Sequence, residues 1–345
     1  MKSSLKSILL CLLAMGTITC AGQEQDPAIY NDDPMQERAL NVPESEYYLR
    51  VPTGLEEVSM RVEPPNWWVD MKNNRLELMV YAKGAAGYDQ VIINYPGVAV
   101  ESVKRQENPN YLFIGLKINP GTSPGSFQLH LASSDLAQKV MEPMILDYEL
   151  LPHPRSGWAG REQLGPQDLI YLIMPDRFAN GNPDNDIVAE TNDRLLNRKK
   201  FFFRHGGDLQ GIIDHLDYLE DLGVTALWLN PVLENDQPYA SYHGYAVTDH
   251  YRIDRRFGTN EQYLELVEKA HQKGIKIIMD VIFNHVGDEH YLMKDLPGTD
   301  WIHQWPTYTK TTYRAPTLLD PNASEYDRKL MTDGWFDKHM PDLNQ

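Results

Sequence analysis

The sequence contains very little cysteine: two residues in 345, Cys11 and Cys20, both near the N-terminus. Without that segment the chain has no thiol, which excludes a disulfide framework and a thiolate metal site. A run of about 20 apolar residues, the length of a membrane-spanning helix, is also lacking. Basic residues are scarce, 32 against 49 acidic ones, which gives a formal net charge of −17. Such an acidic surface repels phosphate backbones, so we expect no nucleic-acid partner.

The first 21 residues have the features of an export signal. Lys2 and Lys6 give it a basic start, residues 8–14 are apolar, and residues 19–21 end it with small side chains. We therefore expect residues 1–21 to be cleaved from an exported, periplasmic or secreted protein. In an alternative interpretation, Cys20 becomes the lipidated first residue of a lipoprotein.

The composition beyond this segment is that of a globular protein, with 42% apolar and 23% charged residues overall. Residues 22–47 are polar and aperiodic, which predicts a flexible extension. Residues 48–153 contain short β runs separated by turn-forming residues. The predicted strands are 76–81, 90–95, 111–118 and 127–131. This regular spacing predicts a β-sandwich.

Residues 154–345 have a different pattern, in which strands alternate with helices. Short apolar runs at 169–174, 226–229 and 275–283 are typical of buried parallel strands. An apolar stripe over Leu209–Leu222 and a periodic segment from Asn260, the predicted N-cap, to Lys273 predict two helices between them. The order β-α-β-α-β predicts an α/β fold with a parallel sheet. On this pattern, a closed barrel and an open doubly wound sheet are equally possible.

In such sheets, functional residues gather at the carboxyl ends of the strands. The first strand leads into a loop rich in side-chain oxygens. These residues are Asn180, Asn182, Asp184, Asn185 and Asp186. A hard cation takes six to eight oxygen ligands, and such a loop can supply several. The alternative is an ordinary Asx-rich turn.

The third strand carries a second set of polar residues, Asp280, Asn284 and His285. The four-residue spacing of Asp280 and Asn284 predicts that they share one face of the strand. An aspartate in an apolar strand is costly unless it is paired or lines a site. The alternative to a site is a buried ion pair of Asp280 with Arg252 or Arg255.

Several segments together resemble the α-amylase family, glycoside hydrolase family 13. They are Asp280–His285 (DVIFNH), Tyr242–Tyr245 (YHGY), Phe257–Thr259 (FGT) and Met340–Asn344 (MPDLN). The last of these, and Pro65–Met71 (PNWWVDM), are similar to the neopullulanase and cyclomaltodextrinase branch. The resemblance extends from about Glu63 to the C-terminus.

The resemblance implies an N-terminal β-sandwich followed by a (β/α)₈ barrel, of which this chain has the first three strands and the start of the insert after the third. It implies a retaining hydrolase of α-glucosidic bonds in starch-derived maltodextrins, cyclodextrins or pullulan. It assigns substrate binding to His243, Tyr245, Asp280 and His285, with Tyr245 stacking on the sugar beside the cleaved bond. Homodimerisation through the N-terminal domain is seen in this branch.

The resemblance also implies calcium as a cofactor. The Asx-rich loop and the Gly-Gly-Asp before the first helix would bind the ion. The implied ligands are Asn180, Asn182, Asn185, Asp186, Gly206 and Asp208. Asn284 and Asp342 match positions that bind a different calcium ion in many amylases.

Retaining hydrolysis needs two carboxyl groups about 5–5.5 Å apart, and the resemblance places them on the fourth and fifth barrel strands. The sequence has three predicted barrel strands, and its Arg252-Ile253-Asp254 run precedes the FGT segment, so we interpret Asp254 as structural. We therefore expect the catalytic carboxylates beyond residue 345 and no hydrolysis by this incomplete barrel alone. The alternative function is a non-catalytic glucan-binding protein that uses Trp67 and Trp68. Bond preference, α-1,4 or α-1,6, and hydrolysis or transglycosylation stay open.

Overall fold

The computed structural model describes residues 54, 57–134, 142–153 and 163–344. The predicted export signal, residues 1–21, and the predicted extension, residues 22–47, lie outside the described residues. Within the described ranges, no helix is both long enough and apolar enough to cross a membrane. The boundaries predicted for the domains stay a prediction.

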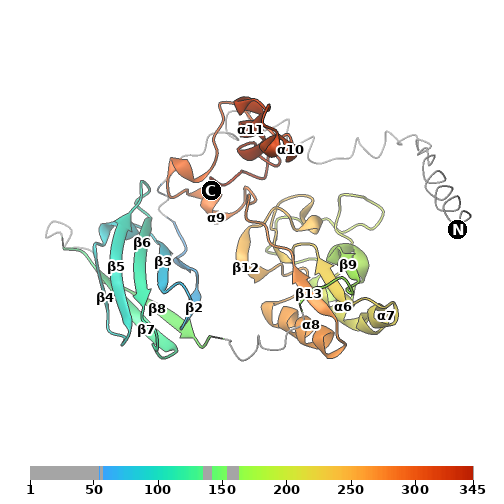
Figure 1. The fold of residues 1–345 in the computed structure, drawn as a ribbon, viewed down its shortest axis with the longest axis horizontal. Coiled ribbons are helices and arrows are strands. Elements are labelled where there is room, and N and C mark those ends of the chain that lie inside the picture. The colour runs from blue at the N-terminus through green and yellow to red at the C-terminus, as the bar shows by residue number, and fades with distance from the viewer. Residues whose placement is uncertain (1–53, 55–56, 135–141, 154–162, 345) are drawn as a thin grey trace, which may run out of the picture. The chain divides into compact units, whose positions relative to one another are not determined.

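Two four-stranded sheets form the predicted β-sandwich, which is confirmed (Figure 1). The first sheet has the order β1 (Arg61–Glu63), β3 (Arg75–Tyr81), β6 (Tyr111–Ile118), β5 (Val98–Arg105). The second has the order β2 (Asn66–Trp68), β8 (Met144–Leu151), β7 (Gly125–Ala132), β4 (Gln90–Ile93). Neighbouring strands are antiparallel except β2 and β8, which run parallel.

Alternate residues of these strands form the sandwich core, as the period of two in a strand requires. In β7, for example, Phe127, Leu129 and Leu131 are buried while the residues between them are not. The strand predicted at 90–95 ends early, at Ile93, because a turn follows in which the Val98 amide donates to the Tyr95 carbonyl. A short 3₁₀ turn, η2 (Ala85–Gly87), lies after β3.

Strand β3 from Leu78 onward and strand β6 as far as Ile114 are buried on both faces. Their second face carries Met79, Tyr81, Tyr111 and Phe113, which join a separate core cluster with residues from 286–302 and with Trp335. This explains why β6 begins with four buried residues in a row instead of alternating. The sandwich is therefore packed directly against the segment that follows the third strand of the parallel sheet.

The predicted parallel sheet is also present, with the strand order β13 (Lys276–Met279), β10 (Ala226–Leu229), β9 (Ile170–Ile173). Helices α6 (Leu209–Asp214), α7 (Leu216–Asp221) and α8 (Asn260–Gln272) share a core with one face of it (Figure 1). Ile173, Leu227 and Leu229 face this core. On the other face Leu172 and Trp228, which are register neighbours, are exposed.

Two predictions about the helices are wrong in detail. The helix predicted over Leu209–Leu222 is two helices, because the backbone leaves the helical region at His215, and Leu222 at the end of the stripe is exposed. Thr259 rather than Asn260 caps α8, since the Asn260 amide oxygen accepts from the Ile253 amide instead.

The third strand ends at Met279, well before Phe283. Asp280 is therefore the first residue after the strand, and the strand alternation predicted for Asp280 and Asn284 does not apply. Both residues still lie at the carboxyl end of the parallel sheet, where the sequence predicted functional residues.

The remaining elements are short and connect these units. After β9 come α5 (Pro175–Phe178) and η4 (Pro183–Asn185), and after β10 come β11 (Leu233–Glu234), η5 (Ser241–His243) and β12 (Asp249–Ile253). After β13 come α9 (Tyr291–Lys294), η6 (Thr299–Trp301), α10 (Pro316–Leu319) and α11 (Glu325–Thr332). Strands β11 and β12 pair antiparallel with a bulge.

Candidate functional site

Tyr245 and Asp280 meet at the carboxyl end of the parallel sheet. The Tyr245 hydroxyl donates to Asp280 Oδ2 at 3.2 Å, and Trp228 Nε1 of β10 donates to the same oxygen at 3.2 Å. Burial, together with the charge of Asp280, raises the pKa of Tyr245, so its hydroxyl stays protonated and can donate. The aromatic ring and the carboxylate thus lie side by side, next to an exposed indole.

The alternative interpretation of Asp280 as half of an ion pair does not agree with the structure. Arg252 pairs with Glu234 at 3.7 Å, and Arg255 pairs with Glu190 at 3.6 Å.

His285 and His243 lie against Tyr245. His285 Nε2 is 3.0 Å from the Tyr245 carbonyl oxygen, and the Tyr245 amide donates to His243 Nδ1 at 2.9 Å. Burial lowers the pKa of both imidazoles to about 4, so both are neutral near pH 7. Because both must gain a proton on unfolding below their ordinary pKa of 6.5, they cost the folded chain stability as the pH falls from about 6.5 toward 4.

Buried polar groups hold the turn that carries His243 and Tyr245 in place. Ala240 has a left-handed backbone, φ 53°, and a Cβ on Gly244 would lie 2.0 Å from the Pro231 carbonyl oxygen. Ser241 donates to Asp193 Oδ2 through its amide at 3.2 Å and its hydroxyl at 2.9 Å. A strained backbone of this kind persists only where contacts with the surrounding residues hold it in place.

Two features of this environment were missed by the sequence reasoning. Asp193 is in an aperiodic segment that gives no sequence signal. Phe336 stacks on the His285 ring with centroids 5.0 Å apart and planes at 21°, and it is 41% exposed. Its place four residues before Met340, within the segment that resembles the amylase family, is the one signal that could have suggested it.

Asp254 has a structural environment, as its position before the FGT segment suggested. It is 1% exposed and accepts from Arg256 Nη2 at 2.7 Å and Nε at 2.9 Å. Burial alone would raise the pKa of Asp254, but the charge and hydrogen bonds of Arg256 outweigh it and hold the pKa well below its usual range. Arg256 also donates to the carbonyls of Asp193 and Asn235, so the pair ties three loops together.

The Asx-rich loop follows α5 and is closed onto the start of α6. Asp208 caps α6 through the Gly211 amide, 2.6 Å from Oδ1, and also accepts from the amides of Gly181 at 3.1 Å and Asn182 at 2.8 Å. The Asn180 amide donates to Asp186 Oδ1 at 2.7 Å. A Cβ on Gly206, φ 83°, would lie 2.4 Å from Asp186 Oδ1. The structure therefore brings the predicted calcium ligands into one loop cluster.

Two observations bear on whether this cluster fits a hard cation. The amide oxygens of Asn180 and Asn185 are buried and have no hydrogen-bond partner, which is costly unless another ligand occupies them. Burial, and the charge of Asp208, raise the pKa of Asp186, so a nearby positive charge would favour its ionised form. The donor set of amide, carboxylate and main-chain oxygens fits calcium.

Other predicted ligands are already used in hydrogen bonds. The Asn182 amide oxygen accepts from the Asp184 amide at 3.2 Å. Among the described residues, no group of three or more His, Cys, Asp or Glu is placed to hold a metal, so any site here needs amide and main-chain oxygens in addition to carboxylates.

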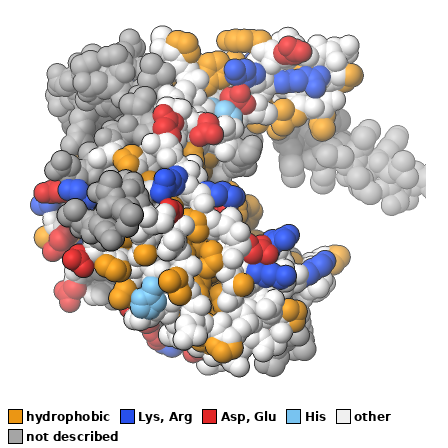
Figure 2. Space-filling view, turned by 90° about the vertical axis from the view of Figure 1, so that its left-hand side faces the viewer, with side chains coloured by type: hydrophobic (Ala, Val, Ile, Leu, Met, Phe, Trp, Pro, Cys, Tyr) orange, Lys and Arg blue, Asp and Glu red, His pale blue; other side chains and the backbone are white. Residues whose placement is uncertain are grey.

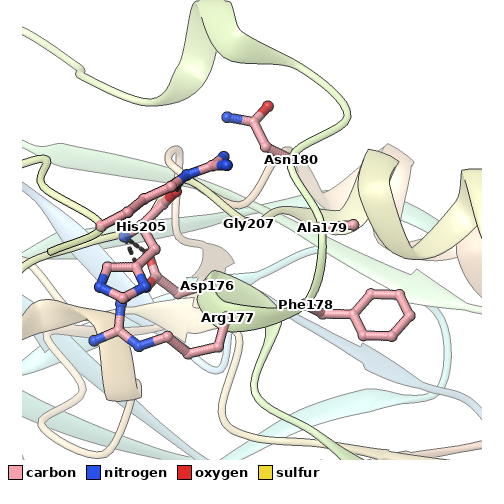
Figure 3. Close-up of a pocket in the computed structure, with 8 residues that line it drawn as sticks. Asp176, Arg177, Phe178, Ala179, Asn180, His205 and Gly207 are labelled. Atoms are coloured by element: carbon pink, nitrogen blue, oxygen red, sulfur yellow. Dashed lines mark hydrogen bonds and ion pairs between the residues drawn. The ribbon is translucent and has the colours of Figure 1, made fainter. Parts of the chain in front are cut away.

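A small pocket of about 130 Å³ lies beside this loop, lined among others by Asp176, Arg177, Asn180 and His205. Figure 3 shows Asp176, Arg177 and His205 close together, with the Asn180 amide directed away from them. The buried Asp176 carboxylate accepts from the His205 amide at 2.9 Å, and Arg177 lies 4.1 Å over the Tyr242 ring. The loop is thereby connected to the turn that carries Tyr245.

The second pair of possible calcium ligands also lies together. Asn284 Nδ2 donates to Asp342 Oδ1 at 2.5 Å, and His303 Nδ1 is 2.7 Å from Asp342 Oδ2. Asp342 is 2% exposed, and its two oxygens are engaged by these neighbours. A role for this pair in binding an ion stays a prediction.

Comparison with known proteins identifies the family. Residues 172–343 match the model of the α-amylase catalytic domain, and residues 61–150 match the model of the cyclomaltodextrinase N-terminal domain. The chain is 43% identical to neopullulanase 2 of Thermoactinomyces vulgaris over 220 residues, covering 64% of this chain and 35% of that protein. It is 35% identical to a cyclomaltodextrinase of Thermoanaerobacter pseudethanolicus over 200 residues, covering 48% of this chain and 33% of that protein.

Solved structures give similar matches. An Anoxybacillus α-amylase is 36% identical, with a TM-score of 0.41, covering 53% of this chain and 35% of that one.

The sandwich and the parallel β/α units coincide with the two matched regions, and together they place the chain in a class of barrel-type glycoside hydrolases. The chain belongs to the α-amylase family, in the branch with a cyclomaltodextrinase N-terminal domain. Strands β9, β10 and β13 are accordingly strands of a (β/α)₈ barrel. The chain spans about a third or less of the length of the curated relatives it matches.

Proposed function

We propose that this chain supplies the N-terminal sandwich and the substrate-binding strands of an α-glucan hydrolase of the neopullulanase and cyclomaltodextrinase type, which acts with retention on maltodextrins, cyclodextrins or pullulan. The observation that carries this proposal is the contact of Tyr245 with Asp280 at 3.2 Å beside His243 and His285. An aromatic face covers the apolar side of a sugar, and a carboxylate and imidazoles bond its hydroxyls. We also propose that the protein is exported, because its first 21 residues have the pattern of an export signal.

Hydrolysis requires two carboxylates about 5–5.5 Å apart, one as nucleophile and one as general acid. Asp280 accepts from Trp228 and Tyr245, and no sequence pattern of the catalytic pair occurs in these 345 residues. We propose that these residues position the sugar and leave the chemistry to carboxylates on the fourth and fifth barrel strands.

The purified chain is therefore expected to bind maltoheptaose or β-cyclodextrin without hydrolysing either, because it contains the proposed sugar-binding residues and no sequence pattern of the catalytic pair. Isothermal titration calorimetry measures the binding, and chromatography of released sugars over a day measures turnover. Turnover above a protein-free blank would overturn the assignment of the catalytic pair, and absence of binding would overturn the proposed role of the site.

We also propose that calcium binds the Asx-rich loop. The buried, unpartnered amide oxygens of Asn180 and Asn185 support this, together with the Asp186 carboxylate and the Gly206 main chain. Asp208 would act partly through its hydrogen bonds to Gly181 and Asn182, which shape the loop. The ion would hold this loop against the start of α6, a structural role that adds no step to the reaction.

Calcium is expected to raise the melting temperature of the chain by several degrees over the chelator-treated protein, because an ion that binds only the folded state stabilises it. Asp186→Ala should abolish this rise, whereas Asp184→Ala, in the same loop at an exposed position, should keep it. Differential scanning fluorimetry with EDTA or calcium chloride measures both. An equal rise in the two variants would contradict the proposed ligands.

A second candidate function is glucan binding by the sandwich without catalysis. Trp67 and Trp68 are both partly exposed, with ring centroids 5.5 Å apart, although Trp67 also packs against the sandwich core. A groove of about 420 Å³ at turns of the sandwich is lined by Tyr95, Asn119 and neighbouring uncharged residues, a combination that suits a neutral sugar. In affinity electrophoresis in amylopectin, a Trp67/Trp68 double alanine variant with normal retardation excludes the tryptophan platform.

Homodimerisation through the sandwich is a further proposal. The outer surface of the sandwich shows apolar side chains among acidic and basic ones (Figure 2). Ile92 and Ile145 are 60% and 49% exposed and lie on either side of His130 in the paired strands β4, β7 and β8. Exposed apolar side chains that lie this close together, here with one histidine between them, favour association.

A further inference from the structure

Asp295, just after α9, is a carboxylate with 0% exposure that the glucan site does not use. Its hydrogen bonds include four from neutral donors in the described part of the chain. These are Asn108 Nδ2 at 2.6 Å, Gly54 N at 2.9 Å, Asn110 Nδ2 at 2.9 Å and the Tyr81 hydroxyl at 3.2 Å. Tyr81, Asn108 and Asn110 belong to the sandwich, whereas Asp295 belongs to the insert after β13. The carboxylate therefore joins two parts of the fold that are far apart in the sequence.

The main chain beside Asp295 is held by the same sandwich residues. The Tyr111 hydroxyl donates to the Asp295 carbonyl at 2.6 Å, and Asn108 donates to the carbonyls of Leu296 at 2.7 Å and Pro297 at 3.0 Å. A buried carboxylate costs free energy unless its hydrogen bonds are made, and those bonds have narrow geometry. The hydrogen bonds from the sandwich therefore favour this one position of residues 295–297.

A short series of contacts links residues 295–297 to the glucan site. Val286, next to His285, lies in the same core cluster as Tyr81 and Tyr111 of the sandwich. The Gly287 amide donates to the Val247 carbonyl at 2.8 Å, two residues after Tyr245, and the His290 amide donates to the Gly287 carbonyl at 2.9 Å. Residues 285–297 therefore form a continuous packed segment between the sandwich and the Tyr245 turn.

We propose that Asp295 is a positioning residue for the glucan site: by fixing the sandwich against residues 285–297, it holds His285 and the Tyr245 turn in their binding geometry. The proposal rests on the proposed function, because it concerns the same sugar-binding residues. It gives the sandwich a role in substrate binding that requires no contact between the sandwich and the sugar.

The test compares Asp295→Ala and Asp295→Asn with Asp147→Ala as a matched control. Asp147 is an exposed sandwich aspartate that also accepts from a side-chain amide, that of Gln128 at 3.0 Å. At a temperature well below every melting transition, Asp295→Ala should raise the dissociation constant for maltoheptaose about tenfold. Asp295→Asn, which keeps one acceptor oxygen, should have a smaller effect, and Asp147→Ala should have none.

A double-mutant cycle separates positioning from a loss of stability. If Asp295 acts through the Tyr245 turn, Tyr245→Ala should remove most of the effect of Asp295→Ala on affinity, because coupled residues are not additive. A folded Asp295→Ala variant with wild-type affinity, or effects that simply add, would overturn the proposal.

Two other outcomes remain informative. Should Asp295→Ala fail to fold, Tyr111→Phe replaces it, since that change removes only the hydroxyl bond to the Asp295 carbonyl. Should the wild-type chain bind no maltoheptaose, the proposed function fails, and hydrogen exchange of the Gly287 amide then decides the inference by itself. Exchange in Asp295→Asn as slow as in the wild type would contradict positioning by Asp295.

Discussion

Replacing Arg256 with alanine is expected to destabilise the chain by about 3–5 kcal/mol, the cost typical of removing one partner from a buried ion pair. Arg256 and Asp254 are each 1% exposed, so the variant leaves the Asp254 carboxylate buried without its cation. It also removes the donors to the carbonyls of Asp193 and Asn235. Urea denaturation monitored by circular dichroism measures the free energy of unfolding.

The adjacent arginine provides the matched control. Arg255 pairs with Glu190 at 3.6 Å, and both side chains are substantially exposed to solvent. Exposed pairs of this kind contribute about 0–1 kcal/mol. Arg255→Ala should therefore change the free energy of unfolding little. A comparable loss of stability in both variants would contradict the larger contribution expected of the buried pair.

Replacing Tyr245 with alanine is expected to weaken maltoheptaose binding tenfold or more, corresponding to about 1.4 kcal/mol or above. The variant removes the aromatic face next to Asp280 and the hydroxyl that donates to Asp280 Oδ2. Calorimetric titration of the wild type and the variant under the same conditions measures the change.

Tyr218→Ala serves as the control, because this tyrosine is exposed on α7, away from the carboxyl ends of the strands. It should leave the affinity unchanged. Wild-type affinity in Tyr245→Ala would place the glucan elsewhere, with the Trp67 and Trp68 platform as the next candidate to examine.

The spacing of apolar residues and the positions of turn-forming residues in the sequence are sufficient to predict most of the fold. Strand 111–118 and strand 226–229 have the predicted bounds, because apolar runs between turn residues leave little freedom. The break at His215 was not predictable in this way, since the apolar stripe continues through it to Leu219. The choice between a barrel and an open sheet came from the family resemblance, because three parallel strands are common to both.

The candidate site was predictable only in part, for a related reason. Asp280 and His285 stand out because polar residues interrupt or follow an apolar strand. Asp193, Asp295 and Phe336 lie in aperiodic segments, and the contacts described above join them to residues 48 to 241 positions away in the sequence. Local patterns carry no information about such pairings, which the folded chain alone brings together.

One end of β3 and one end of β6 are buried on both faces of the sheet. This limits how such sandwiches can be exchanged between related proteins during evolution. A sandwich cut free at its linker would present Met79, Tyr81, Tyr111 and Phe113 to water. A transplanted one would need the same apolar side chains and an asparagine pair placed to meet a carboxylate like Asp295. Recombination within this lineage should therefore have moved the sandwich together with the insert after the third barrel strand, as one inherited block.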